Sequence, residues 1–63
     1  MKFRELPAMW LRQKAEELRS NATAQERAYT GERAVMCRRV GAAYRRAATV
    51  LDEEATAMED EAK

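Results

Sequence analysis

The side chains in this sequence that could take part in chemistry are one thiol, 12 basic groups and 11 acidic groups, with no imidazole. Cys37 therefore has no histidine to act as its base, and a single thiol among scattered carboxylates lacks the ligand spacing of a zinc site. The sequence contains no glycine-rich phosphate loop, and its carboxylates fall on the polar faces of helical patterns. These features predict a non-enzymatic protein without a bound metal or cofactor.

Arginine forms the most regular polar pattern. The stretch CRRVGAAYRRAA, residues 37–48, holds two arginine pairs seven residues apart, which places them on two lines along a helix. The outer line comprises Arg27, Arg38 and Arg45, and the line nearer the core margin comprises Arg39 and Arg46. Aligned arginines can neutralise phosphates, which gives a nucleic-acid stripe as one interpretation. Pairing with Glu16 and Glu17 on a solvated face is the favoured one, because the net charge is only +1 and no aromatic residues are interleaved.

Acidic residues gather near the end of the sequence. Residues 52–63 carry six acids and one base, whereas residues 26–46 carry six bases and two acids. Acids at the carboxyl end of a helix oppose the helix dipole, so this end either frays or is offset by nearby bases. Alternatively, carboxylates such as Glu59 and Asp60 contact a basic partner or mimic a nucleic-acid backbone. The sequence leaves both interpretations open.

The elements that position these groups are helices, because alanine, arginine and glutamate dominate the composition. Apolar residues recur at steps of three and four in two blocks, as expected for two amphipathic helices. The first block contains Ala8, Leu11, Ala15, Leu18, Ala22 and Tyr29. The second contains Met36, Val40, Ala43, Tyr44, Ala47, Leu51, Ala55 and Met58.

Two positions could reverse the chain between these blocks. Asn21 could end a helix, with Thr23 and Glu26 as a capping box for the next one. Gly31 could adopt the left-handed conformation that commonly ends a helix. A third possibility is one unbroken helix within a longer coiled coil, which alone would bury nothing.

Pairing of the apolar blocks favours the reversal at Gly31. It places Leu11 opposite Leu51, Leu18 opposite Tyr44, Ala15 opposite Ala47 and Ala22 opposite Val40. A reversal at Asn21 instead sets Leu11 against charged residues. Because burying a leucine is worth about 1.5–3 kcal/mol and a capping box on the order of 1 kcal/mol, the apolar pairing should prevail.

We therefore predict one all-α domain, an antiparallel helical hairpin. Its first helix spans residues 5–29, its turn residues 30–31 and its second helix residues 32–62. Gly41 should face small Ala22, which allows close approach of the helices. The core and dimer-interface residues expected from the pattern are Leu11, Ala15, Leu18, Ala22, Met36, Val40, Tyr44, Ala47 and Leu51.

The length of the chain favours association. A domain of 63 residues has a marginal core, and a single cysteine cannot form an internal disulfide. Because the apolar faces are wider than one helix–helix seam, two hairpins should pack back to back as a homodimeric four-helix bundle. Further residues are candidates for contact with a different protein partner: Met9, Trp10, the five arginines of the two lines, Glu59 and Asp60. For Trp10, a place as a core anchor is the favoured interpretation and a partner contact the alternative.

Two stretches, WLRQKAEELR at 10–19 and AAYRRAATVLDE at 42–53, resemble a pattern found in very small helical proteins of phages and prophages. The resemblance implies a helical accessory protein that binds and inhibits or redirects a host protein, and no site residues are carried over from it. The polar start MKFRELPAMW does not read as a signal peptide, and no apolar run approaches the roughly 20 residues that span a bilayer. We expect a cytoplasmic protein, in the host cytoplasm if viral.

The favoured function is thus a protein–protein interaction module, plausible as a modulator of host machinery or host defence. The first alternative is a small nucleic-acid-binding or transcription-modulating protein that uses the arginine lines. The second alternative is a structural coiled-coil assembly module.

Overall fold

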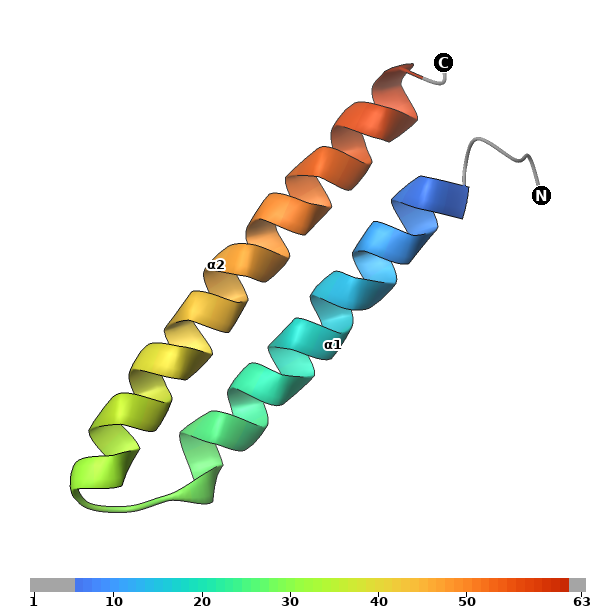
Figure 1. The fold of residues 1–63 in the computed structure, drawn as a ribbon. Helices are drawn as coiled ribbons and strands as arrows, with labels where there is room; N and C mark the ends of the chain where they lie inside the picture. Colours follow the sequence, from blue (N-terminus) through green and yellow to red (C-terminus); the bar gives the residue numbers. More distant parts are fainter. Residues whose placement is uncertain (1–5, 62–63) are drawn as a thin grey trace.

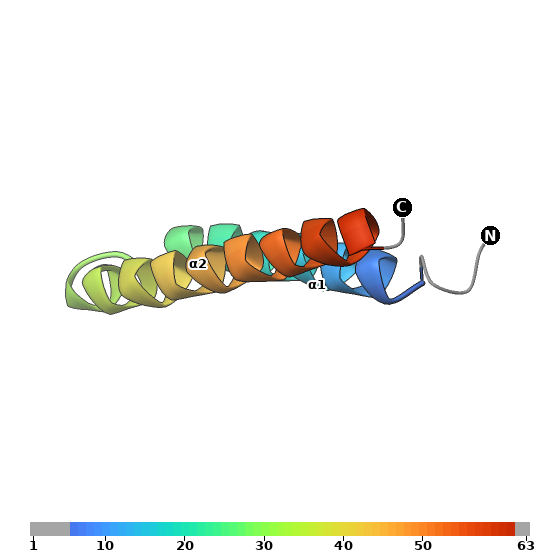
Figure 2. The same cartoon turned by 90° about the horizontal axis from the view of Figure 1, so that it is seen from above.

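The computed structural model describes residues 6–61 as two long helices, α1 (Leu6–Ala28) and α2 (Glu32–Glu61). They run antiparallel and side by side, so that the start of α1 and the end of α2 lie at the same end of the molecule (Figure 1). The hairpin measures 49 × 17 × 8 Å between Cα atoms, and the view from above shows its flatness (Figure 2). No strand occurs between residues 6 and 61, and the predicted all-α hairpin is confirmed.

The chain reverses at Gly31, as the apolar pairing predicts, and Asn21 lies well inside α1. Gly31 has a φ of 71° and directly precedes α2. The amide of Ala34 donates a hydrogen bond of 3.1 Å to the Gly31 carbonyl oxygen, which closes the first turn of α2. A left-handed residue is needed here, and glycine adopts that conformation without the steric penalty of a side chain.

Small residues at every seventh position form the contact between the helices. On α1 they are Ala8, Ala15 and Ala22, and on α2 they are Gly41, Ala48 and Ala55; all six are buried. A Cβ atom added at Gly41 would lie 3.2 Å from the Ala22 carbonyl oxygen and 3.1 Å from Cγ of Glu26. The close approach of Gly41 and Ala22 is therefore confirmed, and it explains why glycine is tolerated within a helix.

The expected pairing is wrong by one residue on α2. Val40 and Ala47, expected opposite Ala22 and Ala15, are exposed, and Gly41 and Ala48 take the buried positions. The prediction placed large apolar residues of α1 and α2 opposite one another. In the structure the two helices instead contact each other through their smallest residues, alanine and glycine. No large side chain in the described residues is fully buried as a result.

Candidate protein-interaction surfaces

One face of the flat hairpin carries salt bridges between the helices. Arg12 pairs with Glu59, Arg19 with Asp52, and Arg45 with Glu26, the last at 2.6 Å between Nη2 and Oε1. Each of these six residues is the fourth after a buried small residue, so the pairs recur at seven-residue intervals along both helices. We call this side of the hairpin the charged face.

Threonines extend the network of the charged face. Arg12 donates to the Thr56 hydroxyl at 3.1 Å, and Arg45 donates to the Thr23 hydroxyl at 3.2 Å. Arg12 also lies 3.7 Å from Asp52, which joins two neighbouring pairs. The arginines on this face therefore bind acceptors of the same chain.

Hydrogen bonding within these pairs favours the charged forms. The guanidinium of Arg45 lowers the pKa of Glu26 below its ordinary value of 4.5, chiefly through their hydrogen bond. Hydrogen bonds to Glu59 and Asp52 raise the pKa of Arg12 and of Arg19, respectively. The three arginines each pair with one acidic residue, so the formal charges of the charged face offset one another.

The predicted pairing of the arginine lines with Glu16 and Glu17 is wrong. Glu16 instead accepts from Arg19 at 2.8 Å, and Glu17 pairs with Lys14 at 3.2 Å. Both contacts join residues three apart on α1, where side chains of one helix are neighbours. Arg45 instead forms a salt bridge with Glu26, which lies nearer the turn at Gly31 than Glu16 or Glu17 does.

The remaining arginines are available to solvent or to a partner. Arg27, Arg38, Arg39 and Arg46 are exposed, and within the described chain none of them forms a salt bridge. Arg33 lies over the ring of Tyr29, 5.8 Å from its centroid, a cation–π contact. Of the two acidic candidates, Glu59 is held by Arg12 and Asp60 is exposed.

The opposite face of the hairpin is apolar. Its residues are Cys37 and the third residue after each buried small residue except Ala22, which is followed at that spacing by Gln25; they are only half-buried. They are Leu11 and Leu18 on α1, and Cys37, Tyr44, Leu51 and Met58 on α2. We call this side the apolar face, and nothing in a single hairpin covers it completely.

A further strip of apolar side chains runs beside this face on the outer side of α2. Its residues follow one another at steps of four, three, four and three: Met36, Val40, Ala43, Ala47 and Val50. All five are exposed; Met36 and Val50 each expose 60% of their surface and Val40 exposes 38%. We call these five residues the outer strip. They have the spacing of a coiled-coil seam, yet α1 does not cover them.

The predicted core and dimer residues thus divide into three groups. Ala15 and Ala22 are buried between the helices; Leu11, Leu18, Tyr44 and Leu51 flank that contact; Met36, Val40 and Ala47 lie on the outer strip. Val50, which also lies on the outer strip, is absent from the predicted core and dimer residues. Its spacing from Val40, Ala43 and Ala47 was the available signal.

Met9 and Trp10 lie near the start of α1, at the end of the hairpin away from the turn. They expose 46% and 63% of their surfaces, respectively. A tryptophan this exposed contributes little to the fold of a single hairpin, and aromatic residues are enriched at protein interfaces. Both residues are accessible to a partner, and the favoured interpretation of Trp10 as a core anchor is wrong for the single hairpin.

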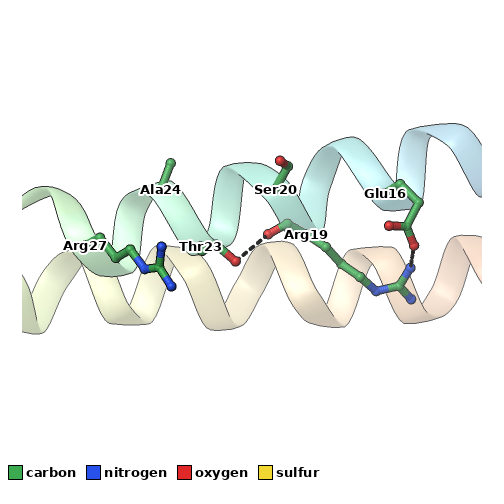
Figure 3. Close-up of a pocket in the computed structure, with 6 residues that line it drawn as sticks. All are labelled: Glu16, Arg19, Ser20, Thr23, Ala24 and Arg27. Atoms are coloured by element: carbon green, nitrogen blue, oxygen red, sulfur yellow. Dashed lines mark hydrogen bonds and ion pairs between the residues drawn. The ribbon is translucent and has the colours of Figure 1, made fainter.

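Besides a hollow around the Arg19–Asp52 salt bridge, two shallow depressions on the described surface involve the candidate residues. The first lies on α1 and is lined by Glu16, Arg19, Ser20, Thr23, Ala24 and Arg27, with Glu16 paired to Arg19 (Figure 3). Because all six residues come from one helix, it is a hollow between side chains and not a cleft between elements. The second lies at the turn and is lined by Gln25, Tyr29, Glu32, Arg33, Met36 and Cys37.

Charge is divided along the hairpin as well as between its faces. In the half next to the turn, residues 20–48, six arginines stand against Glu26 and Glu32, a net charge of +4. In the other half, residues 6–19 and 49–61, three bases stand against eight acids, a net charge of −5. We call these the turn half and the open half.

No protein-family model, curated protein or solved structure matches this chain. Among residues 6–61 there is no group of three or more candidate ligands that could hold a metal ion. Neither α1 nor α2 is long and apolar enough to cross a membrane.

Proposed function

We propose that this protein is a non-enzymatic protein-interaction module that self-associates and binds a second, different protein. The observation that carries this proposal is the composition of the contact between α1 and α2. That contact is built from five alanines and one glycine, while the large apolar side chains lie half-buried or exposed around it. The hairpin thus presents to its surroundings the residues that normally form a core.

The energetics support association. A buried carbon contributes roughly 0.8 kcal/mol, whereas a fully buried leucine or valine contributes about 1.5–3 kcal/mol. Ordering the backbone costs about 1–2 kcal/mol per residue, which a contact made of alanine methyl groups offsets poorly. Covering the apolar face and the outer strip with another chain supplies the missing burial.

The second protein would contact surfaces that self-association leaves open. Trp10 and Met9 project at the open half, and the exposed Arg38, Arg39 and Arg46 project from α2. Tryptophan and arginine are both enriched in interaction hot spots. The resemblance to small phage proteins makes this partner a host protein in the cytoplasm, which the module inhibits or redirects.

Self-association is tested by sedimentation equilibrium of the full chain together with thermal unfolding at several concentrations. We expect a dimer at micromolar concentration and a melting temperature that rises with chain concentration, because unfolding is coupled to dissociation. A folded monomer whose melting temperature is independent of concentration would contradict the proposal.

The contact with a different protein is tested with a photo-crosslinking amino acid at position 10, expressed in the native cell. The captured protein is then purified and its affinity measured for the unmodified chain, for Trp10→Ala and for Gln13→Ala. We expect Trp10→Ala to weaken binding at least tenfold, about 1.4 kcal/mol, and the exposed Gln13→Ala to leave it unchanged. Equal affinities of all three chains would exclude Trp10 from the contact.

A second candidate function, nucleic-acid binding, is favoured by one observation. Arg27, Arg38, Arg39 and Arg46 carry no salt bridge within the described chain and lie in the turn half, where the net charge is +4. Such a surface would retain duplex or single-stranded nucleic acid with an affinity that falls steeply with salt. Filter binding of the unmodified chain and of Arg38→Glu at two salt concentrations distinguishes this function from protein binding.

A further inference from the structure

The outer strip of α2 reads nearly the same in both directions. Val40 and Ala47 are equally distant from a point between residues 43 and 44, and Met36 and Val50 are almost so. A helix with such a strip can pack against an identical antiparallel helix, because each apolar residue then meets an apolar residue of the other copy. The pattern alone also permits a parallel pair, in which each residue meets its own equivalent.

Charges at the two ends of the strip decide between these orientations. The seven-residue spacing of Val40 and Ala47 continues to Arg33 on one side and to Glu54 on the other. In the antiparallel pair, Arg33 of each copy lies opposite Glu54 of the other. In the parallel pair, arginine meets arginine and glutamate meets glutamate, which is unfavourable.

The charge of the whole hairpin favours the same orientation. In the antiparallel register, residues 49–55, with a net charge of −3, lie along residues 32–38 of the other copy, with a net charge of +1, and only the central residues 39–48 face the same residues of the other copy. A parallel pair lays like against like over the full length of the helices. Charge complementarity of this kind fixes the orientation of an interface more than its strength.

The shape of the surface is also complementary. The depression at the turn is lined by Tyr29, Met36 and Cys37, among others, and lies at the Arg33 end of the strip. Antiparallel packing about the point between residues 43 and 44 brings Val50 of the second copy to this depression. Val50 is among the most exposed large apolar residues of α2, so a projecting side chain meets a hollow.

From these observations we propose that two copies of the chain pack through the outer strip of α2 in antiparallel orientation, with Arg33 of each copy against Glu54 of the other. This inference rests on the self-association proposed above and adds its surface, its orientation and its register. The two α1 helices then flank the central pair of α2 helices. The apolar faces of both copies adjoin the interface.

Directed disulfide crosslinking tests the orientation. Two chains are prepared in a Cys37→Ser background, one carrying Val40→Cys and the other Ala47→Cys; both positions are exposed in the single hairpin. In the antiparallel dimer, residue 40 meets residue 47 of the other copy, whereas two copies of residue 40 are about 10 Å apart along the axis. A disulfide requires Cα atoms within roughly 7 Å, so crosslinks should form only when the two chains are mixed.

The other possible results of the crosslinking experiment contradict the proposed orientation or the proposed surface. Crosslinking of each variant with itself would show parallel packing, and a dimer in sedimentation without any crosslink would show that another face is used. Either result overturns the inference while leaving self-association intact. A monomeric unmodified chain would overturn both.

Charge exchange provides an independent measurement on the dimer. We expect Arg33→Glu and Glu54→Arg each to weaken dimerisation on the order of tenfold, because each variant creates two like-charge contacts. The double variant restores opposite charges and should recover the affinity of the unmodified chain. Arg38→Glu, at an exposed position on the side of α2 away from the strip, is the matched control; additive losses in the double variant would overturn the orientation.

Discussion

Gly31 shows how much of this fold depends on a single backbone conformation. Within residues 6–61 it alone has a positive φ, and no atom lies within 4 Å of the place where a Cβ would be added. Gly31→Ala should therefore destabilise the hairpin by about 1 kcal/mol, through the backbone alone and not through a clash. Urea unfolding measures this loss.

Gly31→Asn is the informative comparison for that variant. Asparagine tolerates the left-handed region better than alanine, so it should lose less stability. Equal midpoints for the alanine variant and the unmodified chain would mean that the turn adopts another conformation in solution.

The contribution of the charged face to folding stability depends on pH through Glu26. Its pKa is lowered in the folded chain by the hydrogen bond from Arg45, so its contribution to stability is present above the pKa of the unfolded chain, near 4.5. That contribution is lost as the pH falls through the lower pKa of the folded state. Between about pH 6 and pH 2, Glu26→Gln should therefore lose less stability than the unmodified chain does.

The measurement is the melting temperature of both chains across this pH range, with Glu53→Gln as the control. Glu53 is exposed and, within the described chain, forms no salt bridge. A difference between Glu26→Gln and the unmodified chain that does not change with pH would contradict the role of the pair.

At the scale of the helices, the seven-residue repeat of small residues sets how closely α1 and α2 approach. Ala48→Leu would insert three carbons into a fully buried position, and overpacking of this kind costs about 1–3 kcal/mol. Ala42→Leu places the same side chain at an exposed position of the same helix and should change stability little. Chemical denaturation of the two variants compares them, and equal stabilities would mean that the helices are further apart than described.

The same repeat explains how far the sequence could predict the elements. The three-and-four spacing of apolar residues and a central glycine are enough for two antiparallel helices with a turn at Gly31. The rotation of α2 was not predictable by matching large residues, because contact through Gly41 and Ala48 places Val40 and Ala47 outside. Small residues at steps of seven on both helices were the signal that identifies the contact.

The candidate surfaces were predictable to a different degree. Exposure of Met9 follows from the phase of α1, because this residue lies outside the apolar repeat. The partners in the salt bridges were not predictable, because long side chains can reach several possible partners. Arg45 pairs with Glu26, and Glu16 and Glu17 pair with basic residues of their own helix.

For the whole molecule, a flat pair of helices with opposite charge at its two ends cannot cover its own apolar residues. A substitution at Val50 tests whether another chain covers these apolar residues. In a lone hairpin this residue is 60% exposed, and a polar substitution at such a position usually changes stability by less than about 0.5 kcal/mol. If the outer strip is buried in a dimer, Val50→Asp places a charge in an apolar interface and should cost about 2 kcal/mol or more.

Val35→Asp is the matched control, because Val35 is 51% exposed on the same helix but lies outside the strip. Both variants introduce the same side chain and charge, and the helix dipole favours the aspartate near the start of α2 by at most about 1 kcal/mol, so a larger difference between the two variants reports the interface. We expect the melting temperature of Val50→Asp to fall well below that of Val35→Asp at high chain concentration, and the two to converge on dilution as the unmodified dimer also dissociates. Equal losses at every concentration would show that the strip faces solvent, and the burial that stabilises this hairpin would then have to come from its apolar face.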